Sequence, residues 1–295
     1  MGKNVRDMTS GNIWGHLIWF TIPLLAGTIF QQLYNMVDTI IVGHFVGTIA
    51  LGAVGSIGSL NFLFFSLCSG LASGIGILVA QYFGAGEHEK VKSSVAQAVY
   101  VTLAAGFLMS FIGSVFARPI LVLQNTPPEN LEYAVTYMRI VCGCSFINAV
   151  YNSVSSIMRS LGDSKTPLKF LMLASIVNIV LDLLFVVVFK WGVAGVAIAT
   201  VISQFISATG SIIYGYTHNP YMKLKKEDFK INKAIIKREV TMGLPLALQS
   251  STIAISCVVL QRVVNGFGAI VVAAYTASNK IEQLVQQPFN TLGIT

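Results

Sequence analysis

Residues 167–189 read PLKFLMLASIVNIVLDLLFVVVF, an apolar run in which only Lys169 and Asp182 are charged. A helix needs about 20 mostly apolar residues to cross the hydrocarbon core of a bilayer, and this run is long enough. The whole chain has the same character, because 54% of its 295 residues are apolar and only 11% are charged. A soluble domain carries roughly a quarter charged residues. The composition therefore excludes a soluble globule and a disordered chain, and it predicts an integral membrane protein.

Apolar segments of spanning length recur along the sequence. Several of them exceed the minimum, so they must tilt, kink or protrude from the bilayer. We expect an all-α membrane protein, a polytopic helical bundle with a complete six-helix N-terminal lobe and the first two helices of a second six-helix lobe. The eight predicted spans lie near residues 13–42, 50–82, 92–116, 132–158, 167–189, 192–216, 238–262 and 269–295.

Lysine and arginine gather in the connections on one side of these spans. Such a bias marks the cytoplasmic side, so we predict a multi-pass protein of the plasma (inner) membrane with a cytoplasmic N-terminus. The net charge of +7 is explained by these connections, and no nucleic-acid-binding motif accompanies it. The connection after the sixth span is expected to lie against anionic membrane lipids. Its basic residues are Lys223, Lys225, Lys226, Lys230, Lys233, Lys237 and Arg238.

The start of the chain is similar to the region that follows this basic connection. At an offset of 222 residues, Ile22-Pro23-Leu24 lies over Leu244-Pro245-Leu246. Membrane transporters are often built from repeated halves. We therefore predict an N-terminal lobe at 1–216, a basic cytoplasmic linker at 217–237 and the start of a C-terminal lobe at 238–295. Since the eighth span ends where its counterpart continues, we expect a C-terminally truncated piece of a longer protein.

Polar side chains recur at helical spacing inside four of the spans. A charge or a strong dipole is costly in hydrocarbon, so such faces normally point into the protein or into a wet cavity. One polar chamber within the first six helices would accommodate all four faces. The chamber residues are Gln31, Asn35 and Asp38 in the first span, Asn148 and Asn152 in the fourth, Asn178 and Asp182 in the fifth, and Thr200 and Gln204 in the sixth.

Asp38 and Asp182 are the two acids of this chamber, and neither has a lysine or arginine in its own span that could readily neutralise it. Such a pair can bind and release a proton, or hold a small cation with the help of amide and hydroxyl oxygens. A sodium ion at Asp38, Asn178, Asp182 and Thr200 is compatible with these residues, but no metal is required. The alternative is that each acid is a neutral residue that joins helices by hydrogen bonds. Two acids among aligned amides favour a functional site.

Two further residues have alternative interpretations. Pro23 lies inside the first span and permits a kink there, which is either static or a moving hinge. Glu282 lies in the eighth span near Lys280, where it either pairs at the membrane interface or attracts a cationic substrate. The four cysteines all lie in apolar stretches, so we expect free thiols rather than disulfides or metal ligands.

No catalytic or cofactor-binding motif is present in the sequence. It lacks the Gly-Lys-Ser/Thr phosphate loop, the dinucleotide fingerprint and the His-Glu-x-x-His zinc motif. We therefore expect neither an enzyme nor a cofactor. Energy for transport would come from an ion gradient or from a partner.

Three motifs make the sequence similar to a known family. They are QQLYNMVD at 31–38, VAQYFGAG at 79–86 and RSLGDSKTP at 159–167. With these motifs the chain resembles the MATE (multidrug and toxic compound extrusion) transporters, especially their DinF-like and MepA-like bacterial members. The resemblance implies twelve helices in two lobes, around a V-shaped cleft that opens alternately to either side. It also implies export of cationic, amphipathic compounds in exchange for protons or sodium ions.

The resemblance further suggests roles for individual residues. Asp38 matches the carboxylate that the family protonates, and Pro23 matches a proline at which the first helix bends. The implied ion-coupling residues are Asp38, Asn178, Asp182, Thr200 and Asn152. The resemblance implies a role in drug handling for Glu282. The predicted substrate-binding residues are Gln31, Tyr34, Asn35, Asn148, Gln204 and Glu282.

The predicted function is a cation-coupled multidrug efflux antiporter, a monomer when full length, that exports lipophilic cationic small molecules. At the repeat offset Asp38 falls on Leu260, so coupling is expected in the first lobe alone. Two alternatives stay open. One is a lipid-linked oligosaccharide flippase of a related superfamily, which would want a more cationic cavity. The other is a non-transporting membrane scaffold, in which loss of both acids would change stability but no flux.

Overall fold

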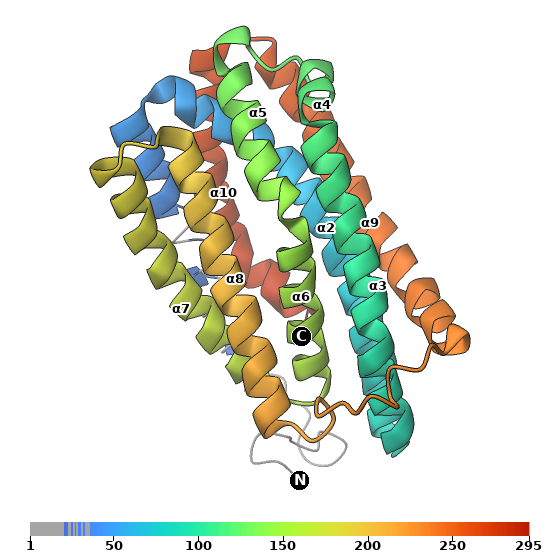
Figure 1. Ribbon diagram of the computed structural model, residues 1–295. Helices are drawn as coiled ribbons and strands as arrows, with labels where there is room; N and C mark the ends of the chain where they lie inside the picture. Colours follow the sequence, from blue (N-terminus) through green and yellow to red (C-terminus); the bar gives the residue numbers. More distant parts are fainter. Residues whose placement is uncertain are drawn as a thin grey trace.

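The fold is described by a computed structural model of the chain, which covers residues 21–22, 25, 27, 29–30, 32 and 36–294. Every regular element in this part is helical, and the long helices run side by side in one bundle (Figure 1). In chain order the elements are η1 (Val42–Val46), α2 (Thr48–Gly84), α3 (His88–Val115), α4 (Ala117–Leu123), α5 (Pro128–Gly143), α6 (Ser145–Ser160), α7 (Lys165–Asp182), η2 (Leu183–Val188), α8 (Gly192–His218), α9 (Lys233–Asn265) and α10 (Ala269–Ile294).

From α2 onward the helices follow the predicted spans, whereas most of the first predicted span, at 13–42, lies outside the described residues. Among the described residues, α2, α3, α7 with η2, α8 and α9 are each long and apolar enough to cross a membrane. α5 and α6 meet the same criterion as a pair with a bend of 43° between them. α10 covers the eighth predicted span, although Lys280, Glu282 and several glutamines make it more polar than the others. The prediction of an all-α polytopic bundle is confirmed.

The fourth predicted span, at 132–158, is not one continuous helix. α5 ends at Gly143 and α6 begins at Ser145. Close to this break, the backbone N–H of Phe146 donates to the hydroxyl of Ser110 on α3 at 3.1 Å. A side chain from a neighbouring helix thus satisfies a backbone donor that would otherwise be unpaired in the bundle. The apolar pattern could not show the break, because it reports which residues are apolar and not where the backbone bends.

Two of the helical stretches end in π-helical turns. η1 is closed by Gly47, whose φ of 114° suits a residue without a Cβ. η2 continues α7 without interruption. Asp38 lies one turn before η1, and Asp182 is the residue immediately before η2. π-helical turns are uncommon and occur frequently at functional sites, so both acids stand at distinctive positions of the backbone.

α2 lies at the centre of the packing, because it contacts α3, α5, α6, α9 and α10. Its contact with α9 is the most extensive. Gly70 and Gly74 face Ala247 and Gly243 so closely that a Cβ on either α2 glycine would overlap the α9 backbone. Small residues allow helices to approach in this way within a membrane. The pairing of α2 with α9 therefore holds the region after the basic connection against the preceding spans.

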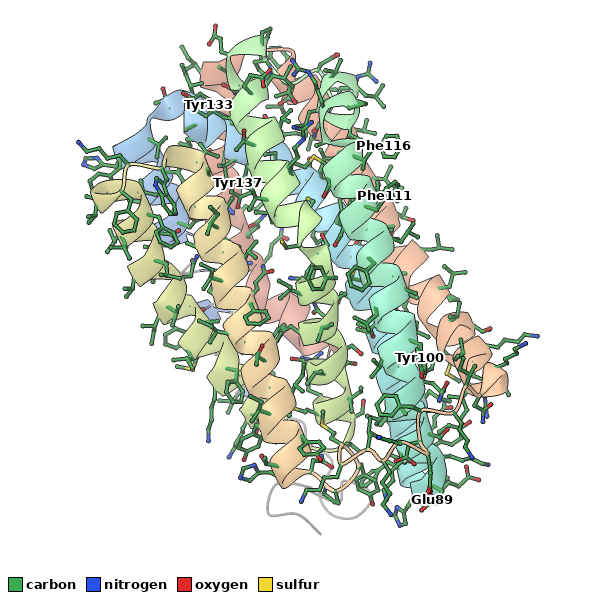
Figure 2. All side chains as sticks on the ribbon, viewed as in Figure 1. Glu89, Tyr100, Phe111, Phe116, Tyr133 and Tyr137 are labelled. Carbon is green, nitrogen blue, oxygen red and sulfur yellow. The ribbon has the colours of Figure 1, made fainter. Side chains whose placement is uncertain are left out.

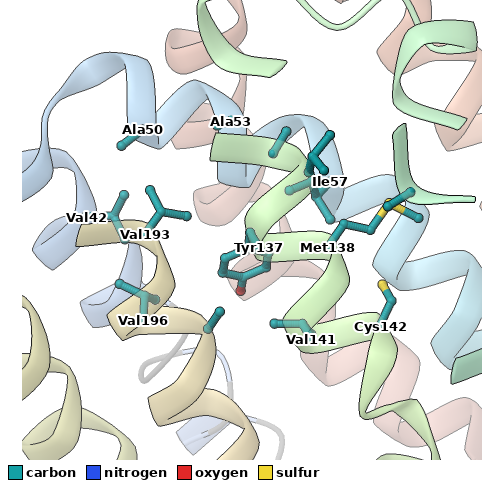
Figure 3. Close-up of a cluster of buried hydrophobic side chains, with 14 of the residues drawn as sticks. Val42, Ala50, Ala53, Ile57, Tyr137, Met138, Val141, Cys142, Val193 and Val196 are labelled. Atoms are coloured by element: carbon teal, nitrogen blue, oxygen red, sulfur yellow. The ribbon is translucent and has the colours of Figure 1, made fainter. Parts of the chain in front are cut away.

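Buried apolar side chains form two clusters, and polar residues are interspersed between them. The first cluster joins η1, the start of α2, α5 and the start of α8, and includes Val42, Ile57, Tyr137, Met138 and Val196 (Figure 3). The second cluster joins the end of α2, the start of α3, the end of α6 and α9. Its members include Leu78, Tyr82, Val95, Met158 and Ile235.

The outer surface of the bundle carries many large apolar side chains. Phe111 on α3 and Phe116 directly after this helix are 60% and 46% exposed, whereas Glu89 lies at the other end of α3 (Figure 2). Such an apolar exterior is costly in water and is suited to lipid. The surface therefore agrees with a multi-pass membrane protein.

Candidate functional site

Asp38 and Asp182 bring two carboxyl groups together inside the bundle. Asp38 lies in the helix before η1 and is 9% exposed, and Asp182 ends α7 and is fully buried. The two carboxyl groups are close enough to interact with each other. Because an ionised carboxylate can only accept, a bond between them requires that one of the two carries a proton. The pair is therefore arranged so that it can share one proton.

Three of the four carboxylate oxygens of this pair have no hydrogen-bond partner among the described residues. Oδ1 of Asp38 and both carboxylate oxygens of Asp182 lack one. Asn178 lies one turn earlier on the same face of α7, is 1% exposed, and neither its Oδ1 nor its Nδ2 is paired in the described part of the chain. Buried polar atoms without a partner are rare and cost about 1–3 kcal/mol each. Carboxylate and amide oxygens of this kind are ligands that a proton or a small hard cation can use.

Thr200 is buried on α8, which packs against α7. Its hydroxyl donates to the carbonyl of Val196 in its own helix at 3.0 Å, so lone pairs of the oxygen remain for a ligand. Asn152 on α6 is half-buried and donates to the backbone carbonyl and the Oδ1 of Asn148 at 2.9 and 2.7 Å. The two asparagines of α6 thus bond to each other. Of the predicted ion-coupling residues, the structure shows a direct approach only for Asp38 and Asp182.

Lys280 is a site residue that the spacing analysis missed. It is half-buried on α10, and its positive charge acts on the carboxyl of Asp38. α10 packs on α2 at Gly55, where Thr276, one turn before Lys280, occupies the space that a Cβ would need. From the sequence, Lys280 was considered only as a possible partner of Glu282. The usable signal was a cation inside a predicted span, because such a charge normally finds an opposite charge in the protein interior.

Glu282 is exposed, and its carboxylate accepts a hydrogen bond from Gln286 Nε2 at 2.8 Å. Within the described residues the ion pairs are Lys90 with Glu87 and Arg118 with Glu132, so Glu282 is not paired with Lys280 there. Gln204 is half-buried on α8. Four other predicted residues lie outside the described residues, namely Pro23, Gln31, Tyr34 and Asn35.

The described part of the chain contains no cluster of three or more His, Cys, Asp or Glu side chains that could hold a metal ion. Cys68 and Cys142 are buried, Cys144 is half-buried and Cys257 is exposed, and all four are free thiols. A fit to a cation therefore rests on the two acids together with amide and hydroxyl oxygens. This donor set suits a proton or a weakly held monovalent ion better than a transition metal.

Long apolar helices that enclose a buried pair of acids define a multi-spanning helical membrane protein. A family model described as MatE matches residues 23–184, which is more than half of the chain. The chain belongs to the MatE family. This confirms the resemblance that the motifs indicated.

Individual relatives agree with this assignment. The chain is 30% identical over 290 residues to the "Probable multidrug resistance protein YoeA" of Bacillus subtilis, with 96% of this chain and 63% of YoeA covered. It superimposes on an outward-facing multidrug resistance MATE family transporter with a TM-score of 0.85 and 25% identity, covering 98% of this chain and 64% of that one. For the MATE multidrug transporter DinF-BH in complex with R6G, the TM-score is 0.90 at 22% identity, with 99% and 66% covered.

The chain therefore spans about 63% of the length of YoeA. The relatives with solved structures are transporters, which agrees with the expectation that the protein is not an enzyme. The buried acids and the cation on α10 are the features of this chain from which a function can be argued.

Proposed function

We propose that the complete protein is a cation-coupled multidrug antiporter that exports lipophilic cationic compounds by alternating access. The observation that carries the proposal is the buried pair Asp38 and Asp182, whose carboxyl groups interact with each other. Oδ1 of Asp38 and both carboxylate oxygens of Asp182 have no hydrogen-bond partner in the described residues. A pair of this kind can bind a proton or a sodium ion, whereas a passive scaffold would not require such a costly buried pair. Membership of the MatE family supports transport.

In the proposed cycle, a proton or a sodium ion enters the first lobe from outside and neutralises the acidic pair. The charge on Asp38 and Asp182 then changes directly beside η1 and η2, where the helical hydrogen bonding is already irregular. The first helix shifts in response, with Pro23 as the expected hinge, and the substrate is expelled. Coupling requires that the ion and the substrate favour different states of one equilibrium.

The proposed substrates follow from the chemistry of the chamber. Its charged and polar residues are acidic or neutral, apart from Lys280, and its walls are apolar. Such a surface attracts compounds that are both lipophilic and positively charged. A pyrophosphate-linked sugar would want several cations instead, so the flippase alternative has less support. The names of YoeA and of DinF-BH, the latter in complex with R6G, agree with a drug-like substrate.

The proposed division of the chain is a first lobe at 1–216, a cytoplasmic linker at 217–237 and the start of a second lobe at 238–295. The seam between α2 and α9, with Gly74 against Gly243, supports this division. The linker carries a cluster of lysines, which supports a cytoplasmic position beside anionic headgroups. α9 begins directly after it, where the Asn232 side chain accepts hydrogen bonds from Ala234 N and Ile235 N.

The test is transport by the full-length gene product in liposomes. A fluorescent lipophilic cation is followed under an imposed proton gradient and, separately, under a sodium gradient. We expect gradient-driven flux from the wild type and none from Asp38→Asn, because an amide binds neither ion in the same way. Glu89→Gln is the matched control, since it makes the same carboxyl-to-amide change at an exposed position of α3.

Each outcome decides the proposal. Flux that is lost in Asp38→Asn and kept in Glu89→Gln supports coupling at the buried pair. Full flux in Asp38→Asn would show that the pair does not couple transport. A correctly inserted wild type without flux under either gradient would contradict the antiporter and favour the scaffold.

A further inference from the structure

Glu239 is a further buried acid, far along the sequence from the pair described above. It lies in the second turn of α9, it is 0% exposed, and neither of its carboxylate oxygens has a hydrogen-bond partner among the described residues. The neighbouring Arg238 does not neutralise it. Arg238 Nη1 donates to the hydroxyl of Tyr82 at 2.9 Å, and its guanidinium lies 5.6 Å from the centre of that ring.

No basic side chain forms an ion pair with Glu239 among the described residues, where the ion pairs are Lys90 with Glu87 and Arg118 with Glu132. The lysines at the start of α9, Lys233 and Lys237, are exposed. α9 packs mainly on α2 and α3. α2 contains no acidic or basic residue in its whole length, and its titratable side chains are Cys68 and Tyr82. α3 carries its charges at its start, with Tyr100 as its one further titratable group, and α10 contributes Tyr275, Lys280 and Glu282. The charged residues at the start of α3 are His88, Glu89, Lys90 and Lys92.

The packing on either side of Glu239 is apolar and tight. One turn before it, Ile235 is buried in the second apolar cluster together with Leu78 and Val79 of α2. One turn after it, a Cβ on Gly243 would lie 2.9 Å from the Cα of Leu71. The carboxyl group is therefore enclosed between an apolar turn and a helix crossing at which the two backbones nearly touch.

An ionised carboxylate in such a place is not plausible energetically. Transfer of an unpaired charge from water into a protein interior costs several kcal/mol even after relaxation. A metal cation would need further ligands, and the described residues contain no cluster of three or more His, Cys, Asp or Glu side chains that could hold one. A proton satisfies the carboxylate without any other ligand. When α9 moves away from α2, water can reach the same carboxyl and the cost of ionisation falls.

We propose that Glu239 is a proton-binding site at the seam between α9 and α2, which holds its proton while the two helices are packed and releases it when they separate. The bound proton is a property of the packed structure. The release step rests on the proposed alternating access, in which the two helices are expected to separate. Glu239 would thus add a third titrating carboxyl to the two of the acidic pair.

The first test is infrared spectroscopy of the purified full-length protein. A protonated carboxyl gives a C=O stretching band that an ionised carboxylate does not give. We expect Glu239→Gln to lose intensity from the band of the protonated acid, and we expect the surface control Glu89→Gln to lose intensity only from the carboxylate bands. Loss of carboxylate intensity in Glu239→Gln would overturn the proposal. This readout needs no transport, so it stands even where the antiporter proposal fails.

The second test measures the separation of the helices. Spin labels are placed at Gln81 on α2 and Lys237 on α9, both exposed, in a full-length background without the native cysteines. One proton released per separation changes the ratio of separated to packed molecules up to tenfold per pH unit. We expect Glu239→Gln to lower this pH response by one proton, and Asp38→Asn to leave that proton in place. An identical pH response in Glu239→Gln and wild type would overturn the release step.

Discussion

Gly74 of α2 and Gly243 of α9 face each other with no side chain between them, and a Cβ on Gly74 would overlap the backbone of Gly243. The same contact is repeated one turn away, between Gly70 and Ala247. Helices associate in membranes through close packing rather than through the hydrophobic effect, so small residues at a crossing determine how near two helices come. This seam is what joins the part of the chain after the basic connection to the part before it.

Gly74→Ala is expected to destabilise the bundle. The added methyl group must push α9 away from α2, and overpacking of this kind costs about 1–3 kcal/mol. The control is Gly58→Ala in the same helix, where a Cβ would meet nothing within 4 Å. The free energy of unfolding, measured on the full-length protein by denaturant titration in detergent, should fall for Gly74→Ala alone. Equal stability of the two variants would show that the seam is loose.

A second junction joins the far end of α9 to the other helices through buried amides. Asn265 Nδ2 donates to the carbonyl of Gln124 at 3.0 Å, and its Oδ1 accepts from Gln261 Nε2 at 2.9 Å and from the Ser56 hydroxyl at 3.3 Å. Asn265, Gln261 and Ser56 are all buried. One side chain therefore connects α9 with α2 and with the end of α4.

Asn265→Ala should weaken this junction strongly. The substitution leaves the amide of Gln261 and the carbonyl of Gln124 buried without their partner, and each unsatisfied group costs about 1–3 kcal/mol. Thr252→Ala is the matched control on α9, because Thr252 is exposed and bonds only to Leu248 of its own helix. The melting temperature of the full-length protein should drop for Asn265→Ala and stay near wild type for Thr252→Ala. A similar melting temperature for both would mean that the network contributes little.

The sequence predicted the spans well because their signal is local. The length of an apolar run such as 167–189 can be read directly from the sequence, and α7 with η2 covers nearly the same residues. The break at Gly143 and the short helix α4 were missed, since both depend on contacts with α3 and on loop geometry. Periodicity reports neither of these.

The candidate site was predictable in part for the same reason. Helical spacing shows which residues share a face of one helix, so Asn178 and Asp182 could be assigned to one face of α7. It does not show how neighbouring helices are rotated. The approach of Asp38 to Asp182 was therefore a hypothesis, and the approach of Lys280 from α10 was not foreseen. Glu239 was missed because it lies at the start of the predicted span 238–262, directly after Lys237 and Arg238, where a charged residue is expected at the membrane surface.

Asp38 and Asp182 should behave as one unit in a double-mutant cycle. Side chains in direct contact commonly show coupling energies of about 0.5–3 kcal/mol, whereas distant sites are additive within about 0.5 kcal/mol. We expect coupling of the first size between Asp38→Asn and Asp182→Asn, measured on the free energy of unfolding of the full-length protein. The control cycle combines Asp38→Asn with Glu89→Gln, whose side chain lies at the surface of α3. Additivity in both cycles would contradict the contact.

Lys280 is expected to determine how many protons or sodium ions must bind before the acidic pair is neutralised. Two carboxyls that share one proton carry one negative charge, and the ammonium of Lys280 balances that charge across α10 and the first helix. Without the ammonium, one proton leaves the pair charged in a place where charge is costly. A second proton or a sodium ion is then needed before the site becomes neutral.

Lys280→Met is therefore expected to take up about one more proton per substrate expelled than the wild type, whereas Lys280→Arg keeps the charge and the wild-type count. The measurement is proton uptake by the full-length protein in weakly buffered detergent solution, recorded while a fluorescent lipophilic cation is displaced. Direct counting separates this effect from a loss of folding, because an unfolded variant binds no substrate to displace. An unchanged proton count in Lys280→Met would show that the charge of Lys280 does not belong to the ion-binding site. The contact of α10 with α2 at Gly55 would then be a packing contact without a role in ion binding.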